Sequence, residues 1–318
     1  MAQFTTYAST DGSAPTLSGT NGSLITVLDA ILVNGYGSKA AAGWSKAFSG
    51  TSKAAYRMGS SNQHYLRVQD DGPGAGTAKE ARITGYESMS DVDTGINPFP
   101  TAAQGVGGVA MQVARKSATA DATARAWVCI ADSRTMYFFA KTGDGATTYL
   151  TFAFGDFYSL IPSDPYRTFL MGRNAENSAT LSADRLDTLA TSVGSTSAIY
   201  VTRGHTGFGG SVNMGKHGDN TKGGGSGVLN GTTPFTNPAD GAIYLAQVWI
   251  HDPTTAPING LRGRMRGFYH FCHAIASVND LDTFSGTGNL ASKTFLILKQ
   301  SGNVGLYVME TSNTLETN

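Results

Sequence analysis

The sequence is poor in charged residues, and most of its acidic residues are aspartate. Charged side chains make up 14% of the 318 residues, against about a quarter in an average globular protein. Of the 23 acidic residues, 18 are Asp and 5 are Glu. Glu favours helices, whereas Asp favours caps and turns. This composition excludes a helical bundle or a coiled coil.

A basic excess, a long hydrophobic run and a cysteine framework are also missing. The 23 basic and 23 acidic residues balance, which argues against a general nucleic-acid binder. No run of 18 apolar residues occurs, and the first residues lack the basic and apolar regions of a secretory signal. We therefore expect no nucleic-acid partner and no membrane partner. The two cysteines, Cys129 and Cys272, are expected to be buried free thiols.

Glycine and hydroxyl residues are abundant and separate short apolar segments. The chain has 40 Gly, 28 Ser and 37 Thr residues. Strand-like segments recur between turn residues, and 126–130 and 135–140 flank the short turn 131–134 as a buried hairpin. The other expected strands are 63–69, 81–86, 111–115, 149–154, 167–171, 198–202, 242–250, 294–298 and 304–309. We predict a mostly β fold, either a β-sandwich or an irregular mixed β-sheet, with long Gly-rich loops.

One short amphipathic helix is predicted near the N-terminus, over residues 23–34. Leu24, Leu28, Ile31 and Leu32 recur at helical spacing, which is typical of a core-facing stripe. Asn21 or Ser23 is placed to cap the start, and the pair 34–35 (Asn-Gly) is placed to end the helix. A second short helix is expected at 87–92.

A glycine-rich segment suggests where the chain divides. Residues 203–241 contain 12 glycines and almost no periodicity, as in a functional loop or a linker. We predict a β-rich N-terminal domain over 1–202, a Gly-rich loop or linker over 203–241, and a C-terminal β segment over 242–318. The last segment could pack on the first domain.

The densest basic cluster is formed by Arg262, Arg264 and Arg266. In an extended strand, residues two apart share a face, so the three guanidinium groups would lie together. Such a face could bind a carboxylate-rich partner or a phosphate chain, or could simply be solvated. We select the three arginines as candidate partner contacts.

His205 and His217 in the Gly-rich segment are further candidate contacts. They could form a metal site with Asp219, but their spacing fits no standard zinc pattern. The run 210–216 matches the phosphate-binding pattern G-x-x-x-x-G-K, but His217 stands where Ser or Thr is needed. We therefore predict no cofactor and no metal ion. No nucleophile motif is present either, so no catalytic residue is assigned.

Two groups of segments carry a resemblance to a known family. The first group is 9–48 (STDGSAPTLSGTNGSLITVLDAILVNGYGSKAAAGWSKAF), 53–57 (KAAYR), 85–95 (GYESMSDVDTG) and 98–101 (PFPT). The second group is 261–264 (LRGR), 282–290 (DTFSGTGNL) and 309–313 (METSN). Together they resemble a family of virion structural proteins of tailed bacteriophages. The resemblance touches both ends of the chain and implies a particle component without known enzymatic residues.

This resemblance agrees with the low charge and the turn-rich β composition. We expect a non-enzymatic structural component of the neck, tail or baseplate, assembled in the host cytoplasm through contacts with itself and other virion proteins. The alternatives are a capsid decoration protein, or a host-surface module that binds glycans through Trp44, Tyr65 or Trp249. A hydrolase is the remaining possibility.

Overall fold

In the part of the chain that it describes, the computed structural model forms two antiparallel β-sheets, one buried helical segment and a short 3₁₀ turn, η2 (Val106–Gly108). The structure describes residues 4–71, 79–143, 149–176, 197–204, 207, 212–217, 245–252, 260–271, 279–287, 291–299 and 306–311. All described strand pairs are antiparallel. The mostly β class predicted from composition is confirmed.

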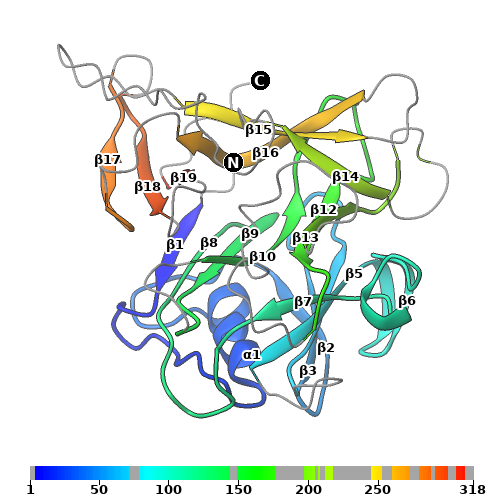
Figure 1. The fold of residues 1–318 in the computed structure, drawn as a ribbon, viewed down its shortest axis with the longest axis horizontal. Helices are drawn as coiled ribbons and strands as arrows, with labels where there is room; N and C mark the ends of the chain where they lie inside the picture. The colour runs from blue at the N-terminus through cyan, green and yellow to red at the C-terminus, as the bar shows by residue number, and fades with distance from the viewer. Residues whose placement is uncertain are drawn as a thin grey trace.

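The first sheet comes from the N-terminal two thirds of the chain, and the second comes mainly from the C-terminal third (Figure 1). The first contains β1 (Thr5–Ala8), β2 (Ser45–Gly50), β3 (Lys53–Arg57), β4 (Tyr65–Gln69), β5 (Glu80–Asp91), β6 (Thr94–Phe99), β7 (Gln112–Arg115), β8 (Trp127–Ala131), β9 (Thr135–Ala140), β10 (Tyr149–Asp156), β12 (Thr168–Arg173) and β13 (Ser197–Val201). The second contains β11 (Tyr158–Ser159), β15 (Leu245–Asp252), β16 (Gly260–Phe271), β17 (Thr283–Ser285), β18 (Thr294–Lys299) and β19 (Leu306–Glu310). Strand β14 (Val212–His217) pairs with β13 on one side and with β15 on the other, and so joins the two sheets.

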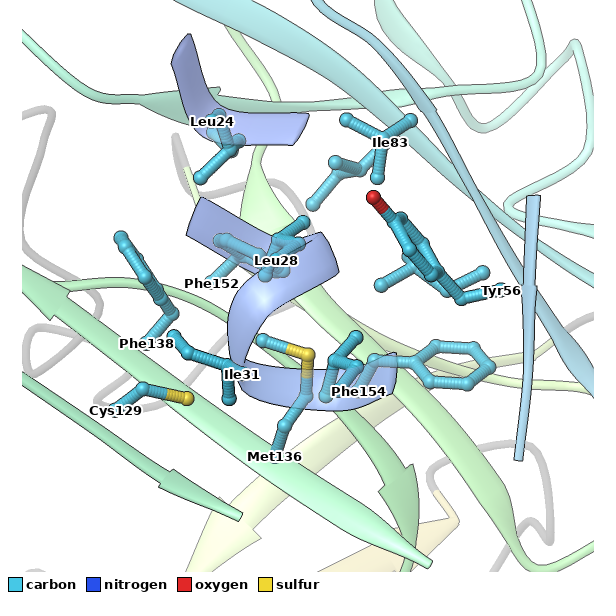
Figure 2. Packing of buried hydrophobic residues seen from close by; sticks show 14 of the residues in the cluster. Leu24, Leu28, Ile31, Tyr56, Ile83, Cys129, Met136, Phe138, Phe152 and Phe154 are labelled. Carbon is cyan, nitrogen blue, oxygen red and sulfur yellow. The ribbon is translucent and has the colours of Figure 1, made fainter. Parts of the chain in front are cut away.

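The first sheet curls around the helical segment. Successive pairings run from β2 through β3, β4, β5, β7, β12, β10, β9 and β8 to β1. Helix α1 (Ser23–Leu28) continues as a π-helical turn, η1 (Asp29–Asn34), inside this curl. Figure 2 shows Leu28 and Ile31 among Phe138, Phe152 and Phe154 of the sheet. Because strands surround the helix, it is buried on more than one face.

The helix begins differently from the sequence expectation. Gly22 is the N-cap, with φ of 75°, and no side chain of the preceding turn caps the amides. Instead, the backbone N–H of Leu24 donates to the carboxylate of Asp70, at the end of β4, over 2.8 Å. Asp70 in turn forms a buried ion pair with Lys116. The helix does end at Asn34 before Gly35, as predicted.

Strands β8 and β9 are buried on both faces, which explains their continuous apolar sequences. Cys129 and Phe138 face the first core, around the helix. Their neighbours Ile130 and Tyr137 face a second core, which includes Val248, Phe268, Leu296 and other residues of the second sheet. Alternate residues of a strand point to opposite faces, so one hairpin contributes to both cores. The predicted hairpin around 131–134 is confirmed.

Two local predictions are wrong. The helix expected at 87–92 is instead the second half of β5, which turns back and pairs with β6. The formation of this hairpin outweighs the weak helical propensity of the segment. Residues 203–241 are also not all loop, because they contain β14; the rest of that segment lies largely outside the described residues. The described helices include none that is long and apolar enough to cross a membrane.

Candidate functional site

Strand β16 carries the three arginines selected from the sequence and lies centrally in the second sheet. It pairs with β15 along one edge and with β11 and β19 along the other. Within these ladders Arg264 is directly opposite Tyr158 of β11 and Trp249 of β15. Directly opposite residues of antiparallel strands point to the same face. Tyr158, Arg264 and Trp249 therefore form one row across three strands.

A pocket of about 600 Å³ lies beside this row. We call it the β11–β16 pocket. Its lining combines arginines, aromatic rings and a single carboxylate: Arg134, Asp156, Phe157, Tyr158, Ser159, Leu160, Arg167, Trp249, Arg264 and Arg266. Its volume is in the usual range of small-ligand sites, about 300–1,000 Å³. The β10–β12 region forms one wall, and β15 with β16 forms the other.

Arg266, in the pocket lining, is bound by hydrogen bonds to the first sheet. Its Nη1 and Nη2 donate to the two carboxylate oxygens of Asp132, in the turn between β8 and β9, over 3.0 and 2.5 Å. Nη1 also donates to Thr135 Oγ1, and the backbone carbonyl of Arg266 accepts a hydrogen bond from Tyr137. Both charged side chains are only 1% exposed. The pair fixes β16 of the second sheet to the first sheet.

Arg262 is also buried beside a carboxylate. Its Nη2 lies 2.8 Å from Oδ2 of Asp164, and both side chains are buried. Burial lowers the pKa of Arg262, while the neighbouring Asp164 and Asp252 raise it. The expectation of an exposed face bearing all three guanidinium groups is therefore wrong for Arg262 and Arg266, because each is buried against a carboxylate of this chain. The side chains of Arg262 and Arg266 therefore present no accessible surface to a partner protein.

Arg264 differs from its two neighbours on β16. It is partly exposed, and its guanidinium carbon lies 5.0 Å from the centroid of the Tyr158 ring. Within the described residues it forms no ion pair with a carboxylate. Cation–π contact holds the guanidinium over the ring without using its hydrogen-bond donors. Arg264 therefore remains a candidate contact residue.

Asp156 is the one carboxylate of the pocket lining. Its side chain is buried, accepts a hydrogen bond from Thr168 Oγ1 over 2.8 Å, and has Oδ2 3.5 Å from Arg167 Nε. Burial raises the pKa of Asp156, and its hydrogen bonds and the nearby arginines oppose this effect. The carboxylate is thus held in place at the wall of the pocket.

The other residues selected from the sequence lie in different surroundings. His217 ends β14 and is in register with Trp249, and its side chain lies outside the described part. His205 lies outside the described residues altogether. Trp44 is buried, and its indole N–H donates to the carbonyl of Asp132. Tyr65 stacks on Phe48 away from the pocket.

Sequence reasoning did not find Asp132, Asp164 or Tyr158 as partners of the arginines. Asp132 and Arg266 are 134 positions apart, and no local pattern connects them. The described residues contain no group of three or more His, Cys, Asp or Glu side chains placed to hold a metal ion. No protein-family model matches the chain, and a search of curated proteins returns no match either.

Proposed function

We propose that this chain is a structural component of a tailed-bacteriophage particle, located in the neck, tail or baseplate. It would assemble in the host cytoplasm by contacts with copies of itself and with other virion proteins. The observation that carries the proposal is the resemblance of its terminal segments to virion structural proteins, together with the position of those segments in the fold.

The first group of resembling segments contains the helix and several strands that pack around it. It supplies Leu28 of the helix, Trp44 of the following loop and Tyr56 of β3, all of which are buried in the first core. Phe99 at the end of β6 completes the same core. A resemblance that coincides with the framework of a fold supports a shared architecture more strongly than one confined to exposed loops.

The second group of segments contributes to the second sheet. Residues 261–264 lie in β16, 282–290 contain β17, and 309–313 include the end of β19. The two groups thus belong to different sheets, and the second core joins those sheets. This distribution supports a resemblance that involves both sheets.

Several surface features suit assembly into a symmetric particle. Strand β2 is mostly exposed and pairs with β3 along one edge only, in the part of the chain that the structure describes. Unpaired backbone groups on an edge strand can pair with another chain. Large apolar side chains are also exposed at Ile96, Val109, Leu160, Leu261 and Leu281. Burial of such groups between subunits would stabilise an assembly.

Quantitative mass spectrometry of purified particles tests this proposal. It would report the copies of this chain relative to the major capsid protein. A small multiple of three or six supports the neck, tail or baseplate, where cyclic symmetry sets the copy number. Hundreds of copies would exclude the neck and the baseplate; they would fit the tail tube, or overturn the proposed location in favour of capsid decoration. Absence of the chain from the particles would overturn the structural role itself.

A further inference from the structure

The β11–β16 pocket combines three features that together point to one class of ligand. It has excess positive charge, an arginine held over an aromatic ring, and a second aromatic side chain beside that arginine. We propose that it binds a carboxylate-bearing sugar, such as a hexuronic acid residue of a polysaccharide. The sugar carboxylate binds Arg264, and the sugar ring packs against Trp249. This inference is independent of the position of the chain in a particle.

The charge balance of the pocket favours an anion. Four arginines line it, and Asp156 is the one acidic lining residue. Asp132 lies behind the wall and neutralises Arg266, while Asp156 faces Arg167. Arg264 forms no ion pair with a carboxylate of the described residues, so its positive charge remains available in the pocket. An anion entering the pocket therefore gains attraction that a neutral ligand does not.

Arg264 is the residue best placed to bind a carboxylate. Its guanidinium carbon lies over the ring of Tyr158, so the orientation of the group is fixed before a ligand arrives. A guanidinium presents a planar fork of donors that matches the two oxygens of a carboxylate. Because less side-chain freedom remains to be lost, a preorganised group of this kind binds more tightly.

The aromatic side chains favour a sugar over a simple inorganic anion. Trp249 and Tyr158 occupy the two positions opposite Arg264 and are both partly exposed. The apolar face of a pyranose ring packs against such a surface, whereas phosphate or acetate would leave it unused. The carboxylate and the ring face of such a sugar are thus both matched.

Calorimetric titration of the full chain with a galacturonic acid trisaccharide tests the proposal. The methyl-esterified trisaccharide is the matched control ligand, because it removes the negative charges and leaves the protein unchanged. We expect the free acid to bind at least tenfold more tightly than the ester, and its affinity to fall as salt is raised. Equal binding of acid and ester, or no binding of the acid at millimolar concentration, would overturn the proposal.

Variants then locate the site. Arg264→Gln and Trp249→Ala should each weaken binding of the acid at least tenfold. Arg57→Gln should leave it unchanged, because Arg57 also lies over a tyrosine ring, that of Tyr65 at 5.8 Å, but outside the pocket. Unchanged binding in folded Arg264→Gln contradicts the assignment. An acidic hexapeptide that competes and binds more tightly than the sugar would also overturn it, in favour of a protein partner. The ester comparison keeps the proposal testable even if a variant fails to fold.

Discussion

Arg266 and Asp132 join the two sheets through a bidentate ion pair, with both side chains buried and 134 positions separating them in the chain. Burying two charges costs hydration energy, which only good geometry and additional hydrogen bonds offset. Those bonds are present, because Asp132 also accepts from the backbone N–H groups of Arg134 and Thr135. The pair therefore orients β16 and, with it, the adjacent Arg264.

Removal of one partner of this pair should be strongly destabilising. We expect Arg266→Met to lower the free energy of unfolding by about 3–5 kcal/mol, because Asp132 is left as an uncompensated buried charge. Lys53→Met is the matched control, since Lys53 pairs with Asp93, whose side chain is 50% exposed. Its cost should be under about 1 kcal/mol. Urea unfolding of the two variants measures the difference, and equal costs would contradict this account of the pair.

The stability of the protein should depend on pH through His64. This side chain is buried, and its ring lies 6.3 Å from that of Phe99. Burial lowers the pKa of His64 to about 4, with Arg203 lowering it further and Glu87 opposing the shift. The unfolded chain takes up this proton near pH 6.5, whereas the folded chain resists protonation down to about pH 4. The contribution is therefore fully present above pH 6.5 and is lost as pH falls toward 4.

The size of this effect follows from the shift of the His64 pKa. A difference of about 2.5 pH units corresponds to about 3 kcal/mol of free energy of unfolding. We expect His64→Gln to lose less stability than the wild type between pH 7 and pH 4, by up to about that amount. Unfolding curves at several pH values provide the comparison. Parallel pH profiles for the two proteins would show that His64 is not responsible.

Gly85 should not tolerate a larger residue. A Cβ atom at this position would lie 2.2 Å from Cε2 of Phe99. Phe99 has little room to move, because it is fully buried and stacks on Phe154 with ring centroids 6.0 Å apart. We expect Gly85→Ala to destabilise the fold by about 1–3 kcal/mol through overpacking. Gly12→Ala is the control, because its Cβ would meet nothing within 4 Å. Thermal unfolding should detect a shift for the first variant only.

Cys129 should be chemically inert in the folded protein. It is fully buried between the helix and the sheet (Figure 2), and burial raises the pKa of its thiol. Because the thiolate is the reactive form, a disulfide reagent should not label it until the chain unfolds. The test uses the Cys272→Ser background, in which Cys129 is the sole thiol. Adding Ser49→Cys, on the exposed strand β2, provides a reactive control. Rapid labelling of Cys129 in the folded state would contradict its position in the core.

Local sequence patterns predicted those elements whose partners are close in the chain. The helix at 23–34 and the hairpin around 131–134 were both predicted, because their apolar spacing and turn residues act over a few positions. The helix expected at 87–92 was wrong because a hairpin with β6 competes with it. Strand β14 was missed because it lies within a glycine-rich segment of little periodicity and because its partners, β13 and β15, belong to different sheets.

In the candidate site, too, local patterns predicted some features, and others depended on residues far apart in the chain. Period-two spacing correctly brings Arg264 and Arg266 to one pocket, because alternation is a property of any strand. Their different environments were not predictable, since Arg266 is neutralised by Asp132 and Arg264 has no such partner among the described residues. His217 and Trp249 become neighbours in register only through the pairing of β14 with β15.

The sequence by itself determined the β class, the buried helix and the apolar hairpin, because composition and short-range periodicity govern local backbone conformation. Only the tertiary structure decided that β8 and β9 serve two cores, that two of the three arginines on β16 are buried in ion pairs, and that the third lies beside an aromatic pocket. Those outcomes depend on contacts between residues far apart in the chain, and local patterns carry no information about which distant strands pair.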